Sequence, residues 1–415
     1  MKKLLSILGA VNLTVTGAGN IVACESGKPK QIKKSKPPHQ SEKPEENKQI
    51  TLVSNWEETN GTVWNLIADK NNNVYVGTRT ADYRGNLFKL TPDGTLSPVN
   101  SWKETNGTVW NLIADKNNNV YVGTRTADYR GNLFKLTPGG TLSPVNSWKE
   151  TNGTVWSLIT DKNNNVYVGT KTANDRGNLF KLTPGGTLSP VNSWNETNGT
   201  VWSLIADKNN NVYVGTKTAN DRGNLFKLTP GGTLSPVNSW KETNGEAWSL
   251  IADKNNNVYV GTKTTRGQDN LFKLTPGGTL SPVTSWNETN GTVWNLIADK
   301  NNNVYAGTWT AGGKSNLFKL TPGGTLSPVN SWKETNGEAW SLIVDGNNNV
   351  YVGTTTADDR GKLFKSSDGG KTFVLVTSWD EDNGEVKSLV ADKNNNIYIG
   401  TRIETSKGKL FKLIT

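Results

Sequence analysis

The chain of 415 residues contains one cysteine, one histidine and one methionine. The cysteine, Cys24, and the histidine, His39, both lie within the first 50 residues. The rest of the chain therefore has no side chains for a Cys–His or Ser–His–Asp catalytic group, or for a metal site built on His or Cys. We expect no cofactor and no metal, and any catalysis would have to use carboxylates, Tyr, Lys or Arg.

Beyond the N-terminal segment, the chain also lacks a large excess of charge of one sign. The formal net charge is +10, but residues 1–50 hold nine Lys against four Glu, which leaves 37 basic and 32 acidic residues for the remainder. A surplus of five basic residues over so long a segment keeps a protein soluble and does not form a phosphate-binding stripe. Nucleic-acid binding is not expected.

What the chain does have is a repeat of 46 residues, seen clearly from Lys103 to Trp148. Self-similarity at a period of about 40 to 50 residues is typical of propellers and solenoids. The copies number eight. Their final Trp recurs every 46 residues, and the last one follows a single inserted residue: Trp56, Trp102, Trp148, Trp194, Trp240, Trp286, Trp332 and Trp379.

Each copy contains four short apolar runs, which in the Lys103 copy are residues 109–114, 120–124, 133–136 and 142–148. Runs of this length and composition, bounded by turn residues, indicate strands. The Asn-rich segment 115–119 and the Thr-Pro-Gly-Gly segment 137–140 are typical of hairpin turns. The unit is therefore predicted to be a four-stranded antiparallel meander, which is one blade of a β-propeller.

The ends of the repeat region indicate that the ring closes. The last copy stops at Leu413, after its third strand, and the missing fourth strand precedes the first copy as residues 51–56. Pro lies in the fourth run of six copies, which places that run at the outer edge of the blade. We predict an all-β, eight-bladed propeller over residues 51–415, closed by burial of Leu52, Val53 and Trp56. The Trp residues of the first run are expected to be core.

Three segments of one copy, residues 155–161, 165–170 and 177–182, resemble the repeat of two-component-regulator-type sensor propellers. This resemblance covers residues 51–415, and it implies the fold and not the function, because such propellers serve as sensors, lectins, lyases and scaffolds. Residues 366–373, Ser-Ser-Asp-Gly-Gly-Lys-Thr-Phe, fit the Asp-box hairpin of sialidase-like and sortilin-like propellers. In those families the box is a structural turn away from the active site.

Residues 1–23 are predicted to be a lipoprotein signal peptide. Lys2 and Lys3 precede a moderately apolar stretch, and Ile21-Val22-Ala23-Cys24 forms a lipobox. The segment resembles mollicute prolipoproteins, which implies that Cys24 carries the lipid and that the protein lies on the outer face of the bacterial cell membrane. An uncleaved membrane anchor and an ordinary secretory peptide are the alternatives.

Residues 24–50 follow as a Lys-, Pro- and Glu-rich segment that we expect to be a disordered tether. Its simplest role is to hold the propeller away from the bilayer. Its seven Lys could also lie on anionic lipid headgroups, at about 1 kcal/mol each near the surface.

The strands and hairpin turns hardly change between copies, whereas the loop joining the second and third strands varies. This loop is expected on the same ring face as the connection from one blade to the next. Its Tyr and Arg residues are of the types enriched at binding hot spots, and the alternative is that an unpacked loop drifts without function. The candidate binding residues are Tyr83, Arg84, Tyr129, Arg130, Arg176, Arg222, Arg266, Trp309, Lys314 and Arg360.

Carboxylates are plentiful, but an Asp-x-Asn-x-Asn turn occurs in every blade and is expected to cap its own hairpin. It lacks the Gly and the distal Glu of the helix-loop-helix calcium motif. The blade-specific acidic residues are Glu246, Glu338 and Glu385, each following an Asn-Gly pair. They are the candidates for carboxylate-based catalysis.

The first functional hypothesis is a lipid-anchored surface binding protein, an adhesin or lectin-like module that binds a repetitive ligand such as a glycan through several weak sites. Its partners would be the membrane and a glycan or protein of a host surface, and we expect a monomer. The second hypothesis is a structural or antigenic surface repeat protein without a dedicated ligand. A carboxylate-based glycan hydrolase or lyase is the third and least favoured.

Overall fold

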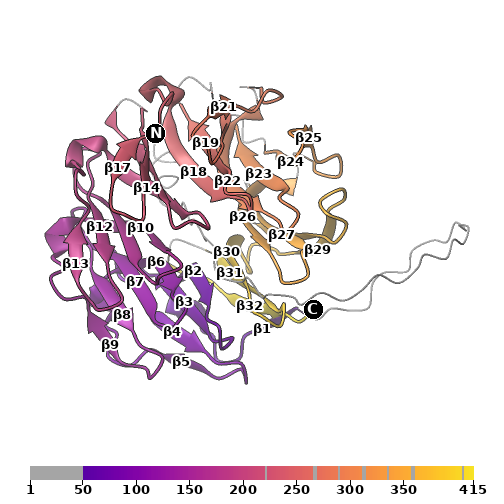
Figure 1. The fold of residues 1–415 in the computed structure, drawn as a ribbon. Helices are drawn as coiled ribbons and strands as arrows, with labels where there is room; N and C mark the ends of the chain where they lie inside the picture. Colours follow the sequence, from indigo (N-terminus) through magenta and orange to yellow (C-terminus); the bar gives the residue numbers. More distant parts are fainter. Residues whose placement is uncertain are drawn as a thin grey trace, which may run out of the picture.

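The computed structural model describes residues 50–219, 222–264, 269–287, 290–310, 315–333, 336–356, 360–403 and 406–415. The signal peptide, the predicted tether as far as residue 49 (with Cys24), Arg266 and Lys314 lie outside the described residues, whereas the last residue of the predicted tether, Ile50, begins a strand. Eight four-stranded antiparallel sheets follow one another around a ring (Figure 1), as the sequence predicts. The described part of the chain contains no helix with the length and hydropathy needed to span a membrane.

The blades are numbered in chain order, and each begins with its innermost strand. Blades 1 to 4 comprise β2 (Thr62–Ala68), β3 (Val74–Arg79), β4 (Leu87–Leu90) and β5 (Leu96–Pro98); β6 (Thr108–Ala114), β7 (Val120–Arg125), β8 (Leu133–Leu136) and β9 (Leu142–Pro144); β10 (Thr154–Thr160), β11 (Val166–Lys171), β12 (Leu179–Leu182) and β13 (Leu188–Pro190); β14 (Thr200–Ala206), β15 (Val212–Lys217), β16 (Leu225–Leu228) and β17 (Leu234–Pro236).

Blades 5 to 8 comprise β18 (Glu246–Ala252), β19 (Val258–Lys263), β20 (Leu271–Leu274) and β21 (Leu280–Pro282); β22 (Thr292–Ala298), β23 (Val304–Trp309), β24 (Leu317–Leu320) and β25 (Leu326–Pro328); β26 (Glu338–Val344), β27 (Val350–Thr355), β28 (Gly361–Ser366) and β29 (Val374–Ser378); β30 (Glu385–Ala391), β31 (Ile397–Arg402), β32 (Leu410–Leu413) and β1 (Ile50–Leu52). Short 3-10 turns precede several inner strands: η1 (Glu58–Asn60), η2 (Glu104–Asn106), η3 (Glu150–Asn152), η4 (Glu196–Asn198) and η6 (Glu242–Asn244).

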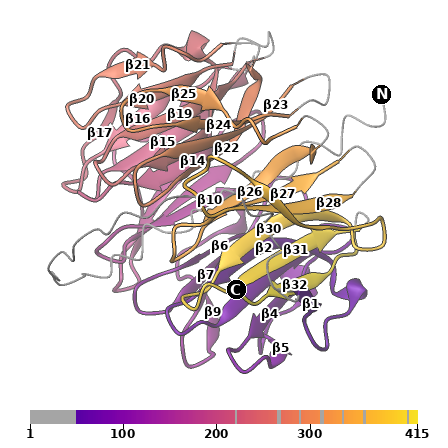
Figure 2. The ribbon, with the colours of Figure 1, turned by 90° about the vertical axis from the view of Figure 1, so that its right-hand side faces the viewer.

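Strand β1 closes the ring, which confirms the predicted exchange of the N-terminal strand into the last blade. It pairs antiparallel with β32, so that Ile50 lies opposite Leu413, and the two strands lie side by side in both ribbon views (Figures 1 and 2). The closing strand covers 50–52 and is shorter than the predicted 51–56. The backbone N–H of Val53 extends the pairing by donating to the carbonyl oxygen of Leu410 at 2.9 Å.

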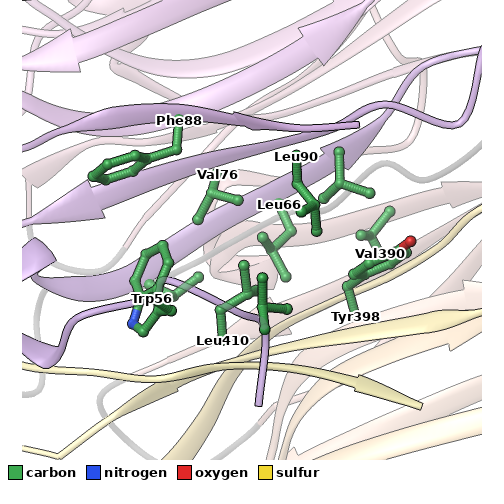
Figure 3. Close-up of a cluster of buried hydrophobic side chains, with 11 residues drawn as sticks. Trp56, Leu66, Val76, Phe88, Leu90, Val390, Tyr398 and Leu410 are labelled. Atoms are coloured by element: carbon green, nitrogen blue, oxygen red, sulfur yellow. The ribbon is translucent and has the colours of Figure 1, made fainter. Parts of the chain in front are cut away.

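The seam between blades 8 and 1 is closed by apolar packing. Trp56 and Leu410 lie in one buried cluster with side chains of both blades (Figure 3), and the Trp56 indole also donates to the carbonyl oxygen of Gly408 at 2.8 Å. The expected burial of Leu52 was wrong, because its side chain is 48% exposed whereas that of Val53 is 7% exposed. Successive residues of a strand point to opposite faces, so only one of the two can enter the core.

Neighbouring blades pack closely because the second strand of each blade carries a Gly where the next blade presents a Val or an Ala. A Cβ placed on Gly77 would lie 2.3 Å from Cγ1 of Val109, which is closer than real Cβ contacts. Each seam has its own buried cluster around such a contact. A larger residue at Gly77 would therefore push two blades apart.

The fourth strands form the outer edges, as their Pro residues predict. Pro98 lies opposite Phe88 at the edge of blade 1. The predicted strand 142–148 is too long, because β9 ends at Pro144 and the backbone N–H of Trp148 turns back to the carbonyl oxygen of Val145. The outer strand of blade 7, β29, is longer than the others, with five residues, and like β1 of blade 8 it contains no Pro.

The two faces of the ring carry different connections. The hairpin face carries the Asp-x-Asn-x-Asn turns, and the loop face carries the loops between second and third strands together with the connections between blades. In blade 1, Oδ1 of Asp69 accepts from the backbone N–H groups of Asn71 and Asn73 at 2.8 Å, and its Oδ2 accepts from the Asn73 amide at 2.8 Å. These carboxylates therefore cap their own hairpins, as the sequence predicts.

The hairpin face is also linked from blade to blade. The backbone N–H of Lys70 donates to Oδ1 of Asn118 in blade 2 at 2.9 Å, and the same bond recurs along the ring. Across the closure, the backbone N–H of Lys393 donates to Oδ1 of Asn72 at 3.0 Å. The Asp-box segment also lies at this face, as a hairpin in which Asp368 Oδ1 accepts from Ser366 Oγ and from the Lys371 N–H. Both motifs serve the fold.

Candidate functional site

The axis of the propeller is filled by tryptophans of the innermost strands. In blade 3, Val155 pairs with Thr170 and Ser157 pairs with Gly169, so Trp156 is the extra residue of a β-bulge. A bulge bends the strand and re-aims the extra side chain. The same bulge recurs in the other blades, and in seven of them the extra residue is Trp: Trp64, Trp110, Trp156, Trp202, Trp248, Trp294 and Trp340.

These seven indoles, here called the Trp ring, stack from blade to blade. Successive ring centroids lie between 4.3 and 5.4 Å apart, and together they form one hydrophobic cluster. The prediction that these tryptophans are core is confirmed. The bulge turns them toward one another around the axis and not into the seams between blades.

Blade 8 interrupts the Trp ring with Lys387, the extra residue of its own bulge. The Lys387 ammonium lies 3.7 Å from the ring centroid of Trp340 and 2.7 Å from Oε2 of Glu385. Both charged side chains are buried, at 3% and 8% exposure. Burial raises the pKa of Glu385, but Lys387 and Arg402 outweigh it and hold that pKa below its usual value. Burial lowers the pKa of Lys387 in turn, and the Glu385 carboxylate counteracts that shift.

A second ring of side chains, here called the cation ring, lies beside the Trp ring at the loop face. It is formed by the last residue of the second strand in six blades: Arg79, Arg125, Lys171, Lys217, Lys263 and Arg402. Several of these cations lie over indoles of the Trp ring, with Cζ of Arg125 5.2 Å from Trp110 and Nζ of Lys263 4.4 Å from Trp248. Cation–π attraction holds them there.

Two of the predicted binding residues, Tyr83 and Tyr129, adjoin the cation ring. The Tyr83 ring lies 4.9 Å from Cζ of Arg125, and the Tyr129 ring lies 5.5 Å from Nζ of Lys171. Each Tyr thus contacts a cation of the following blade. Both are large exposed aromatics, with 41% and 44% of their surface accessible.

The backbone fixes these loops. Tyr83 and Tyr129 both have a φ of 59°, and their carbonyl oxygens accept from the N–H groups of Thr108 and Thr154 in the next inner strands at 2.8 Å. The loop of one blade is therefore tied to the innermost strand of the next. This contact positions each Tyr beside the cation ring.

The other predicted residues that the structure describes are not brought together. Arg84, Arg130 and Arg176 are exposed in separate blades. Two further candidates form exposed ion pairs outside the cation ring, namely Arg222 with Glu242 at 3.8 Å and Arg360 with Glu381 at 2.8 Å. Trp309 is half-buried at the position that the cation ring occupies in other blades.

The three blade-specific carboxylates also lie at the loop face, at the start of innermost strands. Glu246 is fully buried and pairs with Lys217 at 2.8 Å. Burial raises the pKa of Glu338, although Lys387 counteracts that shift. With Glu385 paired to Lys387, two of the three carboxylates are engaged in buried ion pairs.

The cation ring and Lys387 were missed by sequence reasoning. The signal for the first is the basic residue that follows Gly-Thr in six of the eight copies. The signal for the second is the Lys that stands where seven copies have Trp. Both features lie at positions shared between copies, whereas most of the predicted binding residues lie in the loops that differ.

No family model and no curated protein matches this chain. Solved structures do resemble it. Sqt1 from Chaetomium thermophilum superposes with a TM-score of 0.60 at 14% identity, over 86% of this chain and 97% of that one. A prolyl endopeptidase gives 0.55 at 10% identity over 82% of this chain, and puromycin hydrolase gives 0.53 at 13% identity over 84%.

At these identities the likeness shows the β-propeller fold alone. The chain spans 54% of the prolyl endopeptidase and 58% of puromycin hydrolase, so it corresponds to little more than half of either enzyme. Their activities do not transfer to it.

Proposed function

We propose that this chain is a lipid-anchored surface binding protein whose ligand is recognised on the loop face, at the cation ring and its flanking tyrosines. The observation that carries this proposal is the exposure of Tyr83 and Tyr129 beside cations of the following blades. Tyr and Arg presented on a rigid scaffold are the residue types on which binding hot spots are built. The scaffold that carries these tyrosines is rigid because the loops of blades 1, 2 and 3 are each hydrogen-bonded to the innermost strand of the next blade.

The buried carboxylates support binding more than catalysis. A general acid or base must reach the substrate within hydrogen-bond distance. Glu246 has no exposed side-chain surface, and Glu385 has 8%. Because they pair with Lys217 and Lys387, these two carboxylates neutralise buried cations.

Attachment to the membrane is the second component of the proposal. It rests on the lipobox that ends at Cys24 and on the 25 residues between Cys24 and the first described residue, Ile50. Such a segment would separate the propeller from the bilayer. Metabolic labelling of the full chain with a radioactive fatty acid should mark the wild-type protein and not a Cys24→Ser variant. Equal labelling of both would refute the anchor.

The binding proposal is tested with the full-length protein, purified in detergent and applied to a glycan array. We expect binding to a defined set of glycans and its loss in the double variant Tyr83→Ala, Tyr129→Ala. The matched control is Val374→Ala, Leu375→Ala, which removes exposed apolar surface of 66% and 49% accessibility from the outer edge of blade 7. That control should bind as the wild type does.

Retention of binding in the tyrosine variant would place recognition elsewhere on the ring. Absence of binding to every glycan and to host-cell membranes would favour the structural or antigenic repeat protein instead. The near-identity of the copies is compatible with that second function, since it needs no specialised blade.

A further inference from the structure

The positive charges of the cation ring are neutralised unevenly. Lys217 pairs with Glu246 at 2.8 Å, and Arg402 has Glu385 at 3.9 Å. Lys171 has Asp175 at 3.8 Å. Arg79 and Arg125 lie between these sectors, and within the described ranges neither has a carboxylate at ion-pair distance. Blades 1 and 2 therefore present two guanidinium groups without a counter-charge.

These two cations are electrostatically crowded. Burial lowers the pKa of Arg79, and the charges of Arg125 and Arg402 lower it further. In addition, Nε of Arg125 is buried and has no hydrogen-bond partner among the described residues. An arginine has five N–H donors in a fixed fork, and a donor removed from water without a partner costs free energy. An anion bound beside Arg79 and Arg125 would offset the repulsion between these cations and would accept a hydrogen bond from an arginine donor that has no partner.

We propose that Arg79 and Arg125, flanked by Tyr83 and Tyr129, form a binding site for a saccharide that carries carboxylate or sulfate groups. This inference rests on the proposed binding function and assigns the chemical class of its ligand. Guanidinium groups match the planar, two-oxygen geometry of such anions through paired hydrogen bonds. The exposed Tyr rings provide apolar faces with a polar hydroxyl, which suits the mixed surface of a sugar ring.

The observations favour a saccharide over a nucleic acid. Proteins that bind single strands track the backbone with a long cationic groove and stack successive bases on aromatic rings. Here the two guanidinium groups without an ion pair lie in adjacent blades, and the neighbouring blades 3 and 8 contain the carboxylates Asp175 and Glu385. A long polyanion that left this sector through blade 3 would meet the Asp175 carboxylate, whose side chain is 33% exposed.

The test is a titration of the full-length protein, immobilised in detergent through a C-terminal tag. The probes are a sulfated hexasaccharide derived from heparin, a hexasaccharide of galacturonic acid, neutral maltohexaose, inorganic sulfate and a single-stranded DNA hexanucleotide. We expect binding of both acidic hexasaccharides, with an affinity that falls as salt is raised. Maltohexaose should not bind.

The decisive variant is Arg79→Gln, Arg125→Gln. It should weaken binding of the acidic hexasaccharides by roughly tenfold or more for each guanidinium lost, because charge-assisted hydrogen bonds are removed. The matched control, Lys116→Gln, Lys162→Gln, removes the same charge from the hairpin face, where each ammonium donates to a main-chain carbonyl oxygen. It should leave the affinity unchanged. Arg125→Lys keeps the charge without the fork and should give an intermediate loss.

Folding of each variant is checked by thermal melting. The glutamine double variant should melt no lower than the wild type, since it removes like charges that repel one another. Acidic hexasaccharides that bind this variant as tightly as the wild type would overturn the assignment. The assignment would also be overturned if inorganic sulfate bound as tightly as the sulfated hexasaccharide, or if the DNA hexanucleotide bound more tightly than either acidic hexasaccharide.

Failure of this inference is distinguishable from failure of the proposed function. Binding of maltohexaose that is lost in the tyrosine variant, without binding of the acidic probes, would leave the binding protein standing and overturn the acidic ligand. Absence of binding to all five probes would also overturn the acidic ligand, and the glycan array would then decide the general function.

Discussion

The buried pair of Glu385 and Lys387 yields the sharpest stability prediction. Glu385→Gln would leave the Lys387 ammonium in the core, 3.7 Å from the Trp340 ring centroid and without its 2.7 Å partner. Removing one member of a buried ion pair costs about 3–5 kcal/mol, because an uncompensated charge remains. Replacing both members by groups of similar volume, as in Glu385→Gln, Lys387→Met, is expected to be neutral or stabilising by about 1–4 kcal/mol.

The pH dependence follows from the direction of the pKa shift. Lys387 and Arg402 overcome the effect of burial and lower the pKa of Glu385 in the folded state. The contribution of the Glu385 carboxylate to the free energy of unfolding is therefore fully present above the ordinary Glu pKa of about 4.3. This contribution is lost as the pH falls through the lower pKa of the folded state. The stability gap between the wild type and Glu385→Gln should be widest near neutral pH and should narrow below about pH 4.

Urea unfolding of the wild type, the two single variants and the double variant measures the coupling. A single variant Glu385→Gln that unfolds at the same urea concentration as the wild type would refute the reasoning. So would a double variant that is less stable than Glu385→Gln, because the remaining charge is the proposed source of the loss. A gap between wild type and Glu385→Gln that does not change with pH would contradict the pKa argument alone.

Three further variants test other parts of the structure. Trp56→Ala removes a side chain that is 7% exposed and hydrogen-bonded to the carbonyl oxygen of Gly408, so it should lower the free energy of unfolding by about 3–5 kcal/mol. It should also increase proteolysis where the ring closes, which mass spectrometry can follow. Asn118→Ala removes the acceptor for the Lys70 N–H and should lower the free energy of unfolding by about 1 kcal/mol in urea titrations. Burial raises the pKa of Glu338. The cost of ionising this carboxyl in the folded state therefore lowers the stability of the fold as the pH rises above the ordinary Glu pKa. Glu338→Gln should therefore raise the melting temperature at neutral pH and not at low pH, and an equal change at both would contradict the cause.

Most of the fold could be predicted because its determinants are local and repeated. The period of 46 residues, the edge Pro residues and the truncated last copy each act within one blade or between the two ends of the chain. The exposure of Leu52 was missed because the predicted strand placed adjacent residues in the same core. In an edge strand, only one of two consecutive side chains faces inward.

The candidate site was predicted only in part. Tyr83 and Tyr129 stood out as the aromatic residues of variable loops, and the structure places both beside the cation ring. Arg79 and Arg125 were missed because each looks like an ordinary strand end in its own blade. Their significance comes from the closure of the ring, which gathers a cation from each of six blades, and from the carboxylates that lie beside Lys171, Lys217 and Arg402 and that these two arginines lack.

Amide hydrogen exchange of the full-length protein, with and without the sulfated hexasaccharide, tests the central claim most directly. The account predicts added protection at the loop face of blades 1 and 2, in the residues that follow Arg79 and Arg125, and none in the Asp69 and Asp115 turns of the hairpin face. Added protection at the hairpin face, or no change on either face at saturating hexasaccharide, would contradict it.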